Sequence, residues 1–452
     1  MSQITGDPFV SRATGPQQSD MDAWGHSTVI DWQAGDINIK SITAYRELKT
    51  DIGNDADHTE FDLLEQEELN NQDQFSQEVQ ISGRVFDDRL SWVFGVYYMK
   101  ENADRFILGH ILGDFWRAGL FPQVIDTGVA NDIMASAKTF AGFGQGTFNL
   151  TDQLGLTAGV RVSSEKKTLT GIQRGFFARV ENDRGTVSDS WSSVSPRFGI
   201  EYQWTDDVMS YLSAARGFKS GGHTARLNPG APNAGIVSYD PEHLWTYEGG
   251  IRTDFARGRA RANLTGFYSD YTDIQVTFLE FIEGQLFTGL ANVASARIKG
   301  AEFEFTAMPV PELVLNSAIG YIDAKYTAIG PTATEITPDS RFPRTPKWSF
   351  SLGGQYERNV TSGSVLFRAD YSYRSSTQAA EASNVVIDQD GFGLLSARIA
   401  YKHGEGGWKL AVFMTNITDE RYIIGGSELE GMFAQTHTGR PREWGLQALY
   451  QF

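Results

Sequence analysis

The feature that most constrains this chain is a two-residue alternation of apolar and polar side chains, repeated along most of its length. Successive side chains of a β-strand point to opposite faces, so each such run gives a strand with one apolar and one polar face. The polar faces carry full charges, which the interior of a β-sandwich would not tolerate. The alternation therefore predicts either membrane strands with the apolar face toward lipid or surface strands of a soluble sheet. The clearest runs put Phe198, Ile200, Tyr202, Val365, Phe367 and Tyr371 on apolar faces, and Glu201, Glu248, Arg252, Arg368 and Asp370 on polar faces.

The predicted strands are longer than those of soluble proteins. The alternation predicts 17 strands, mostly of 8–14 residues. A soluble strand averages about 5–6 residues, whereas a tilted strand needs about 9–11 residues to cross a bilayer. The predicted strands are 25–33, 36–46, 73–83, 89–100, 136–148, 154–165, 191–204, 207–218, 244–255, 260–277, 293–306, 313–325, 347–356, 364–373, 394–401, 408–417 and 442–452.

The connections between these strands alternate strictly between short turns and long loops. The long loops are predicted at 47–72, 101–135, 166–190, 219–243, 278–292, 326–346, 374–393 and 418–441. Such alternation places every long loop at one end of an up-and-down sheet, as in outer-membrane barrels. A β-propeller is the main soluble alternative, but no blade motif recurs. We therefore expect an all-β fold, a transmembrane antiparallel up-and-down β-barrel.

Composition excludes several other classes of protein. The 452 residues include no cysteine, which excludes a disulfide scaffold, a zinc–thiolate site and a thiol nucleophile. The net charge of −17 disfavours nucleic acid as a partner. No run of about 20 apolar residues is present, so helical membrane spans are not expected. The opening residues MSQITGDP have neither a basic nor an apolar region, so no signal peptide is expected there.

The final predicted strand ends in an aromatic residue, with apolar residues at alternate positions before it. This arrangement resembles the assembly signal of Gram-negative outer-membrane barrels, and the alternative is a plain edge strand. The residues assigned to the signal are Trp444, Gly445, Leu446, Tyr450 and Phe452.

Several short stretches, in this order and spacing, resemble the TonB-dependent receptor family over nearly the whole chain. They are SPRFGIEY at 195–202, ARGFKSGG at 215–222, DPEHLWTYEGGIRTD at 240–254, TPKWS at 345–349, NITDERY at 416–422 and GRPR at 439–442. Each stretch is degenerate, and a structural role at strand ends is sufficient to explain it.

The resemblance implies a barrel of about 22 strands filled by an N-terminal plug, with a motif that recruits TonB. It also implies energy-coupled uptake of a scarce nutrient, most commonly a ferric siderophore. Counting back from the end makes the predicted strands the family's sixth to twenty-second. We therefore expect a truncated receptor: residues 1–24 the remnant of an extracellular loop, residues 25–452 a partial barrel, and no plug. The expected partners are TonB through the missing plug, outer-membrane lipid and lipopolysaccharide, the barrel-assembly machinery and a siderophore-like substrate.

The loop 101–135 is unusually apolar for a solvated loop, which suggests a lid over the barrel mouth that binds substrate. The alternative is that it packs on neighbouring loops. The candidate substrate-binding residues are Phe106, His110, Phe115, Trp116, Arg117 and Phe121.

Other candidate sites are weaker. The acidic loop from Asp51 to Asp73 could hold calcium, but exposed acidic loops are usually only solvated. Haem is disfavoured, although His223, His243 and His437 lie in or near long loops, because the boxes of haem receptors are absent. No nucleophile elbow, phosphate loop or acid–base pair occurs, so we expect no enzyme, no cofactor and no resident metal.

We expect the function of an outer-membrane receptor barrel. The alternatives are a passive porin-like channel, a non-functional receptor fragment, or a soluble propeller lectin. The substrate does not follow from the sequence, because loops vary on one architecture.

Overall fold

The computed structural model describes residues 13, 15–55, 60–62, 64–111, 113–114, 128–175, 183–224, 235–282, 285–331, 333, 336–380, 386–404, 406–429 and 433–451. In this part of the chain no helix is long and apolar enough to cross a membrane.

One antiparallel sheet of 17 strands contains almost all of the regular structure, as the alternation predicts. Apart from two small ribbons, the strands pair in chain order, each with the next. In the sheet they are β1 (Gln18–Ala34), β2 (Ile37–Asp55), β3 (Leu64–Val85), β4 (Leu90–Ile111), β5 (Gly128–Asn149), β6 (Leu154–Gly175), β7 (Asp183–Thr205), β8 (Val208–Lys219), β11 (Glu242–Phe255), β12 (Ala260–Ile282), β13 (Gln285–Val310), β14 (Leu313–Ile329), β15 (Trp348–Val360), β16 (Gly363–Arg374), β17 (Phe392–His403), β18 (Trp408–Thr415) and β21 (Glu443–Tyr450).

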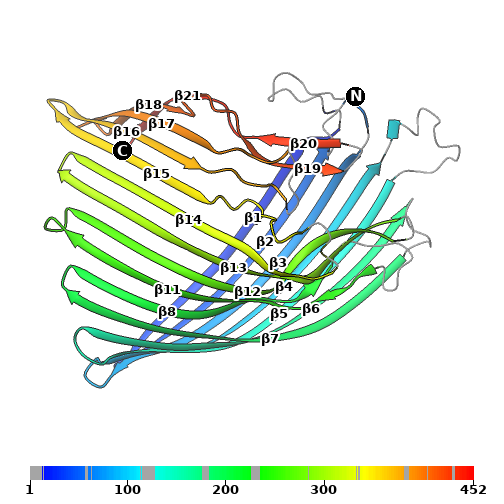
Figure 1. The fold of residues 1–452 in the computed structure, drawn as a ribbon, viewed down its shortest axis with the longest axis horizontal. Coiled ribbons are helices and arrows are strands. Elements are labelled where there is room, and N and C mark those ends of the chain that lie inside the picture. The colour runs from blue at the N-terminus through cyan, green and yellow to red at the C-terminus, as the bar shows by residue number, and fades with distance from the viewer. Residues whose placement is uncertain are drawn as a thin grey trace.

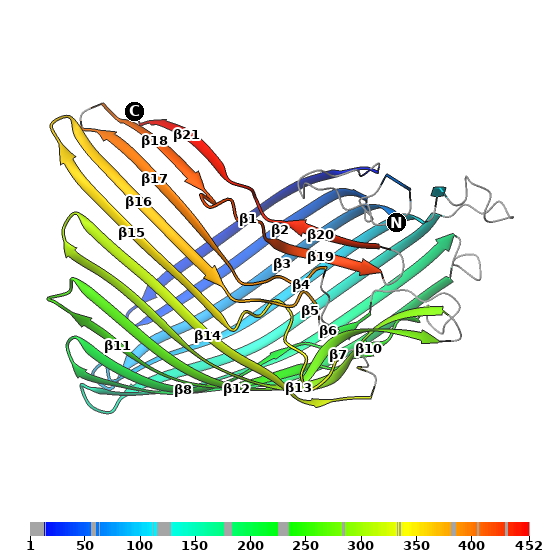
Figure 2. The ribbon, with the colours of Figure 1, turned by 45° about the horizontal axis from the view of Figure 1, so that its top comes forward.

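The two ribbons lie in long connections of the sheet. β9 (Gly222–His223) pairs with β10 (Ser238–Tyr239), and β19 (Ile423–Leu429) pairs with β20 (Phe433–Thr438). Figures 1 and 2 show the main sheet curling round, with the short turns gathered at one end and the ribbons at the other. β1 and β21 are the outer strands, and among the described residues no pairing joins them.

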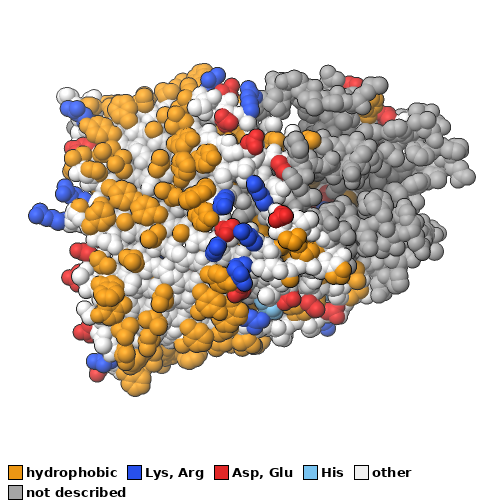
Figure 3. Space-filling model, viewed as in Figure 1, with side chains coloured by type: hydrophobic (Ala, Val, Ile, Leu, Met, Phe, Trp, Pro, Cys, Tyr) orange, Lys and Arg blue, Asp and Glu red, His pale blue; other side chains and the backbone are white. Residues whose placement is uncertain are grey.

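An apolar band covers the outer face of the sheet. Phe198, Ile200 and Phe367 are 55%, 49% and 46% exposed, values that would be anomalous for a run of large side chains in water. Figure 3 shows this band over the half of the sheet nearer the short turns. Aromatic pairs border it, Tyr202 with Trp204 on the short-turn side and Tyr321 with Trp348 on the other. Such a band between aromatic girdles is the lipid-facing surface of a membrane barrel.

The buried apolar clusters lie beyond the band, at the long-loop end. One contains Ile274, Ala294, Tyr326 and Ile336, where the connection after β14 packs on β12–β14. The other contains Ile133, Leu169 and Ile236. The membrane part of the sheet thus has lipid in place of a core, and the wet part has small cores of its own.

The strands continue far beyond the predicted ends, which corrects the predicted long loops. Residues 47–55, 64–72, 101–111, 128–135 and 166–175 are strand, and β1 begins at Gln18. The reason is physical. Alternation requires one face in lipid and the other in water. Beyond the lipid neither face meets hydrocarbon, so the pattern ends while the hydrogen-bonded ladder continues.

The face assignment gives a stability prediction. Replacing Phe367 by Arg puts a charge on the lipid-facing side of β16. We expect this to lower the free energy of unfolding by about 2–4 kcal/mol. The check is the urea midpoint of the complete protein in lipid vesicles, measured by the loss of heat-resistant migration on gels.

Ser372→Arg is the matched control, because Ser372 lies on the opposite face of the same strand, and it should shift the midpoint little. The chain has no cysteine, so single cysteines at 367 and 368 can also be labelled from the lumen. Labelling of position 367 but not of 368 would refute the assignment.

Candidate functional site

Of the predicted substrate-binding residues, Phe106 and His110 lie in the outer part of β4. Their side chains share a face with Phe94 and Tyr98 of the apolar band, because strand positions two apart point the same way. The neighbouring Ile107 packs on the other face, against the cluster of Ile133 and Leu169. The remaining candidates, Phe115, Trp116, Arg117 and Phe121, lie outside the described residues.

The predicted assembly signal forms the edge strand β21. Trp444 and Leu446 are 70% and 74% exposed on its outer face, followed by Tyr450. A side chain at Gly445 would collide with the Phe413 ring of β18, so only glycine lets that ring lie across the strand. Phe452 lies outside the described residues.

The weaker metal candidates do not converge in the described part of the chain. It contains no group of three or more His, Asp or Glu side chains able to hold a metal ion, and Asp57 of the acidic segment lies outside it. The three histidines are in separate elements: His223 in β9, His243 in β11 and His437 in β20.

The structure brings together residues that the sequence analysis named only in separate stretches, such as 215–222 and 240–254, or did not name. They belong to the connection between β8 and β11, whose described parts, residues 220–224 and 235–241, we call the clasp. On one side, Lys167 of β6 donates to the Gly221 carbonyl at 2.8 Å. On the other side, Asn292 of β13 accepts from the Asp240 amide at 2.8 Å and donates to its carbonyl at 2.7 Å. The clasp therefore ties β6 to β13 across the strands between them.

Further contacts, both polar and apolar, hold the clasp to the wall formed by β5–β7. The His223 imidazole is 3.1 Å from Asp189 of β7, and the Ser238 hydroxyl donates to the same carboxylate at 2.6 Å. Ile236 packs against Ile133 of β5 and Leu169 of β6. Polar and apolar contacts thus fix both arms of the clasp.

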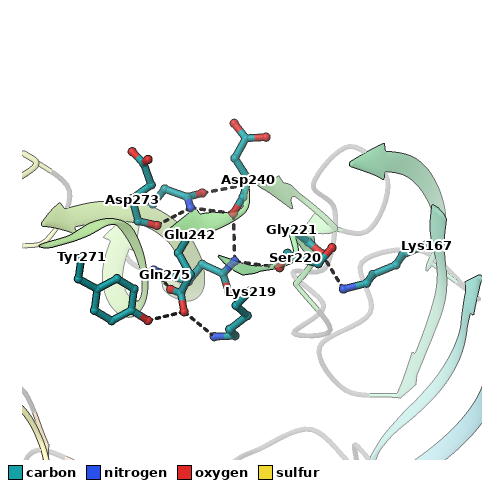
Figure 4. Close-up of polar contacts among 10 residues, drawn as sticks. Lys167, Lys219, Ser220, Gly221, Asp240, Glu242, Tyr271, Asp273 and Gln275 are labelled. Carbon is teal, nitrogen blue, oxygen red and sulfur yellow. Dashed lines mark hydrogen bonds and ion pairs between the residues drawn. The ribbon is translucent and has the colours of Figure 1, made fainter. Parts of the chain in front are cut away.

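Glu242 anchors the other end of the clasp, where it enters β11 (Figure 4). This carboxylate is only 4% exposed, and it accepts from the Tyr271 hydroxyl and, at 2.7 Å, from the Gln275 amide. Lys219 of β8 lies 3.6 Å from it. The Gln275 side chain in turn donates to the Ser220 and Asp240 carbonyls at 3.0 Å. A buried charge with two hydrogen-bond donors and one ion-pair partner joins β8, β11, β12 and the clasp.

Hydrogen bonds, burial and charge at the clasp shift the pKa values of Asp189 and Tyr239. Sixteen residues separate Asp189 from the turn after Thr205, about 50 Å of strand, so Asp189 lies beyond the apolar band. Hydrogen bonds from Ser238 and His223 lower the pKa of Asp189 below its ordinary value. Burial raises the pKa of Tyr239 in β10, and the nearby Glu242 charge raises it further.

A cavity of about 500 Å³ opens on the inner, lumen face of the sheet, near the short turns. Its wall is rich in carboxylates, with only two arginines, and Arg261 is held by Asp254 through contacts of 2.7 and 2.9 Å. The acidic residues of the wall are Asp206, Asp207, Glu248, Asp254, Glu302 and Glu304. This inner face can receive a polar, cationic surface, whereas the outer face of the same strands meets lipid.

The Glu242 anchor gives a second prediction. In the Glu242→Ala variant the Tyr271 hydroxyl and Gln275 amide lose their acceptor, which costs about 1–3 kcal/mol locally. We expect faster hydrogen exchange of the segments around Tyr271 and Gly221, while the membrane parts of β8 and β11 stay protected. Asp240→Asn is the control, because it removes an exposed carboxylate of the clasp and keeps its backbone hydrogen bonds. Equal exchange in the two variants would contradict the anchoring role.

The Asp189 contact gives a pH prediction. A carboxyl whose folded pKa is depressed stabilises the fold above its unfolded value and loses that contribution as the pH falls through the folded value. The clasp should therefore open as the pH falls below about 4, the ordinary range of an aspartate, and through the lowered pKa of Asp189. Hydrogen exchange of residues 221–224, corrected for the intrinsic rate, measures this opening. In Asp189→Asn the opening should no longer depend on pH in that window, and a persisting dependence would assign it to another group.

Comparisons with known proteins show which protein family has this architecture. The family model "TonB dependent receptor-like, beta-barrel" matches residues 3–417. The metal-pseudopaline receptor CntO of Pseudomonas aeruginosa is 28% identical over 217 residues, which are 46% of this chain and 28% of that protein. The pesticin receptor of Yersinia pestis is 25% identical over 383 residues, which are 78% of this chain and 48% of the relative. The chain thus spans less than half the length of these curated relatives.

Solved structures share the fold. The ferric yersiniabactin uptake receptor FyuA of Yersinia pestis superposes with a TM-score of 0.79 at 17% identity, covering 96% of this chain and 62% of that one. The siderophore receptor PiuA of Acinetobacter baumannii gives 0.74 at 14% identity, covering 95% and 64%. Proteins of this family are transporters and not enzymes. With the family model matched over most of its length and a sheet that curls as a membrane barrel, the chain belongs to the TonB-dependent receptor family.

Proposed function

We propose that this protein imports a metal–chelate complex, specifically a ferric siderophore, across the outer membrane of a Gram-negative cell in a TonB-dependent cycle. The observation that carries the proposal is the combination of a lipid-facing apolar band with a polar lumen in a chain of this family. The names of its relatives support the substrate class, because they are receptors for metal-pseudopaline and ferric yersiniabactin.

The lumen wall supports a role for a plug. Its six carboxylates around one cavity face away from lipid and offer ion pairs to a cationic surface inside the barrel. In the proposed cycle a plug fills this space, and TonB acts on the plug to open a path for the substrate. The barrel supplies the fixed wall, and the clasp holds the mouth end of β6–β13 in place while the plug moves.

The outer surface supports the remaining partners. The exposed Trp444, Leu446 and Tyr450 of β21 suit recognition by the barrel-assembly machinery, and the apolar band suits the outer-membrane lipids, including lipopolysaccharide.

Transport by the protein expressed from its complete gene tests the proposal. In a host lacking its own ferric siderophore receptors, we expect growth under iron limitation with a subset of ferric siderophores, and loss of that growth when TonB is inactivated. The iron-free siderophores should not support growth. Uptake that persists without TonB would instead show a passive channel.

Substitutions in the apolar segment 101–135 test whether its aromatic residues bind the transported siderophore. Replacing Phe115, Trp116 and Phe121 with Ala should weaken binding of the transported siderophore, because buried aromatic anchors typically cost more than about 1 kcal/mol each when truncated. Phe86→Ala, at a short turn on the opposite side of the membrane, is the control. Unchanged affinity in the triple variant, with intact heat-resistant migration, would assign the segment to packing.

A further inference from the structure

Lys and Arg side chains gather at one place on the outer face of the sheet, where the apolar band ends toward the long loops (Figure 3). They come from three neighbouring elements: Arg297 and Lys299 from β13, Lys325 from β14, and Lys347 just before β15. All four side chains are exposed, Arg297 at 56% and Lys299 at 60%. We call these four residues the basic patch.

The register of the sheet brings the patch together. Arg297 lies directly opposite Lys325 on the same face of the β13–β14 pair. Like charges in directly opposite positions destabilise a sheet. Lys299 lies opposite Asp323 on one side and Tyr268 on the other. The sheet therefore holds two cations side by side in a position that favours a bound anion.

The protein's own carboxylates neutralise only part of this charge. Asp270 lies 3.8 Å from Arg297, and Asp323 lies 3.6 Å from Lys299. Among the described residues Lys325 and Lys347 form no ion pair. Four cations and two carboxylates leave a local charge of +2 on a chain whose net charge is −17.

Aromatic rings border the patch on the side nearer the apolar band. The Arg297 guanidinium lies 5.7 Å from the Tyr268 ring centre, and the Lys347 ammonium lies 5.8 Å from that of Tyr321. Trp348 packs on Tyr321 with 4.7 Å between ring centres. Aromatic side chains at a membrane boundary mark the level of the lipid headgroups.

The height of the patch agrees with this level. Twelve residue steps separate Leu313, at the start of β14, from Lys325, about 40 Å along the strand. At a strand tilt of about 40°, this is about 30 Å of height, which equals the hydrocarbon thickness of a bilayer. The four cations therefore lie at the level of the headgroups in the leaflet on the long-loop side.

We propose that the basic patch binds the phosphate groups of lipopolysaccharide in the outer leaflet. This inference rests on the outer-membrane placement proposed above. The patch covers three neighbouring elements, each about 4.8 Å from the next, so it is wider than one phosphate and suits a lipid whose headgroup carries two. Guanidinium and ammonium groups bind phosphate by charge-assisted hydrogen bonds, and the nearby lipid weakens competition from water. The acyl chains of the same lipid then lie on the apolar band below.

Lipid retained by the purified protein tests the proposal. The complete protein is extracted from isolated outer membranes, and lipid A is quantified per protein by mass spectrometry. In the variant with Arg297, Lys299, Lys325 and Lys347 all changed to Gln, we expect retained lipid A to fall about tenfold or more, because each basic residue near an anionic membrane surface adds to the attraction. The matched control changes Arg257, Arg358, Lys402 and Lys409 to Gln. These four exposed cations lie at the short-turn end, and their loss should leave the lipid unchanged.

A second measurement identifies the ligand. Diphosphorylated lipid A added to the delipidated protein in detergent should bind the unmodified protein and not the patch variant, and dephosphorylated lipid A should bind neither. Equal retention by the patch and control variants, or retention of phospholipid in place of lipid A at the patch, would overturn the proposal. Fractionation on a density gradient is done first, because a protein absent from the outer membrane would refute the placement and not the patch. Heat-resistant migration confirms that each variant is folded.

Discussion

The constraint on which this structure depends is that lipid offers no hydrogen bonds. A backbone amide or carbonyl that faces hydrocarbon without a partner costs several kcal/mol, so a chain crossing a bilayer as β-strands must pair every strand with its neighbours. Within the sheet, from β1 to β21, the strands meet this requirement by pairing in chain order, and short turns at one end keep successive strands adjacent; the described pairings leave only the outer edges of β1 and β21 without a neighbour. Once the backbone is paired in this way, the side chains are free to differ completely on the two faces. Phe198 and Ile200 meet lipid, while Glu201, one position away from Ile200, lies on the polar side.

The same pairing explains how glycine and aromatic residues are used together. At Gly95 a Cβ would stand 2.3 Å from the Phe143 ring, and at Gly300 it would stand 2.5 Å from the Phe267 ring. In each case the ring of one strand lies flat over the glycine of the next, so it covers the backbone without widening the sheet. This arrangement suits a wall that has no apolar core of its own. It also makes glycine a structural requirement at these two positions of the sheet.

The sequence predicted the membrane part of this fold well, because alternation records the difference between lipid and water residue by residue. Every one of the 17 strands appears where a run such as 364–373 indicates it. It predicted the outer part poorly. The stretch from Glu47 to Asp55 lies beyond the lipid-facing band, and its pairing with Glu65–Asp73 depends on the neighbouring strand and not on any pattern within itself. Glu242 shows a similar limit at the clasp. Its position in the stretch 240–254 suggested a strand start, but its partners Lys219, Tyr271 and Gln275 come from other strands. Their meeting also depends on the irregular register of β12 between Tyr271 and Gln275.

The clasp has a mechanical consequence for the barrel. Its contacts link Lys167 of β6 to Asn292 of β13 across the four strands between them, β7, β8, β11 and β12. Fixed contacts between two separated strands of a curved sheet set the curvature of the strands between them. This sector of the wall therefore keeps its radius whatever happens at the edges β1 and β21. The long connections beside β15–β18 also contact one another: the Arg344 amide donates to the Gln378 carbonyl, Thr377 pairs with Gln389, and the Gln389 side chain accepts from the Ile423 amide. A deformation that widens the mouth must therefore break contacts of the clasp or of these other connections.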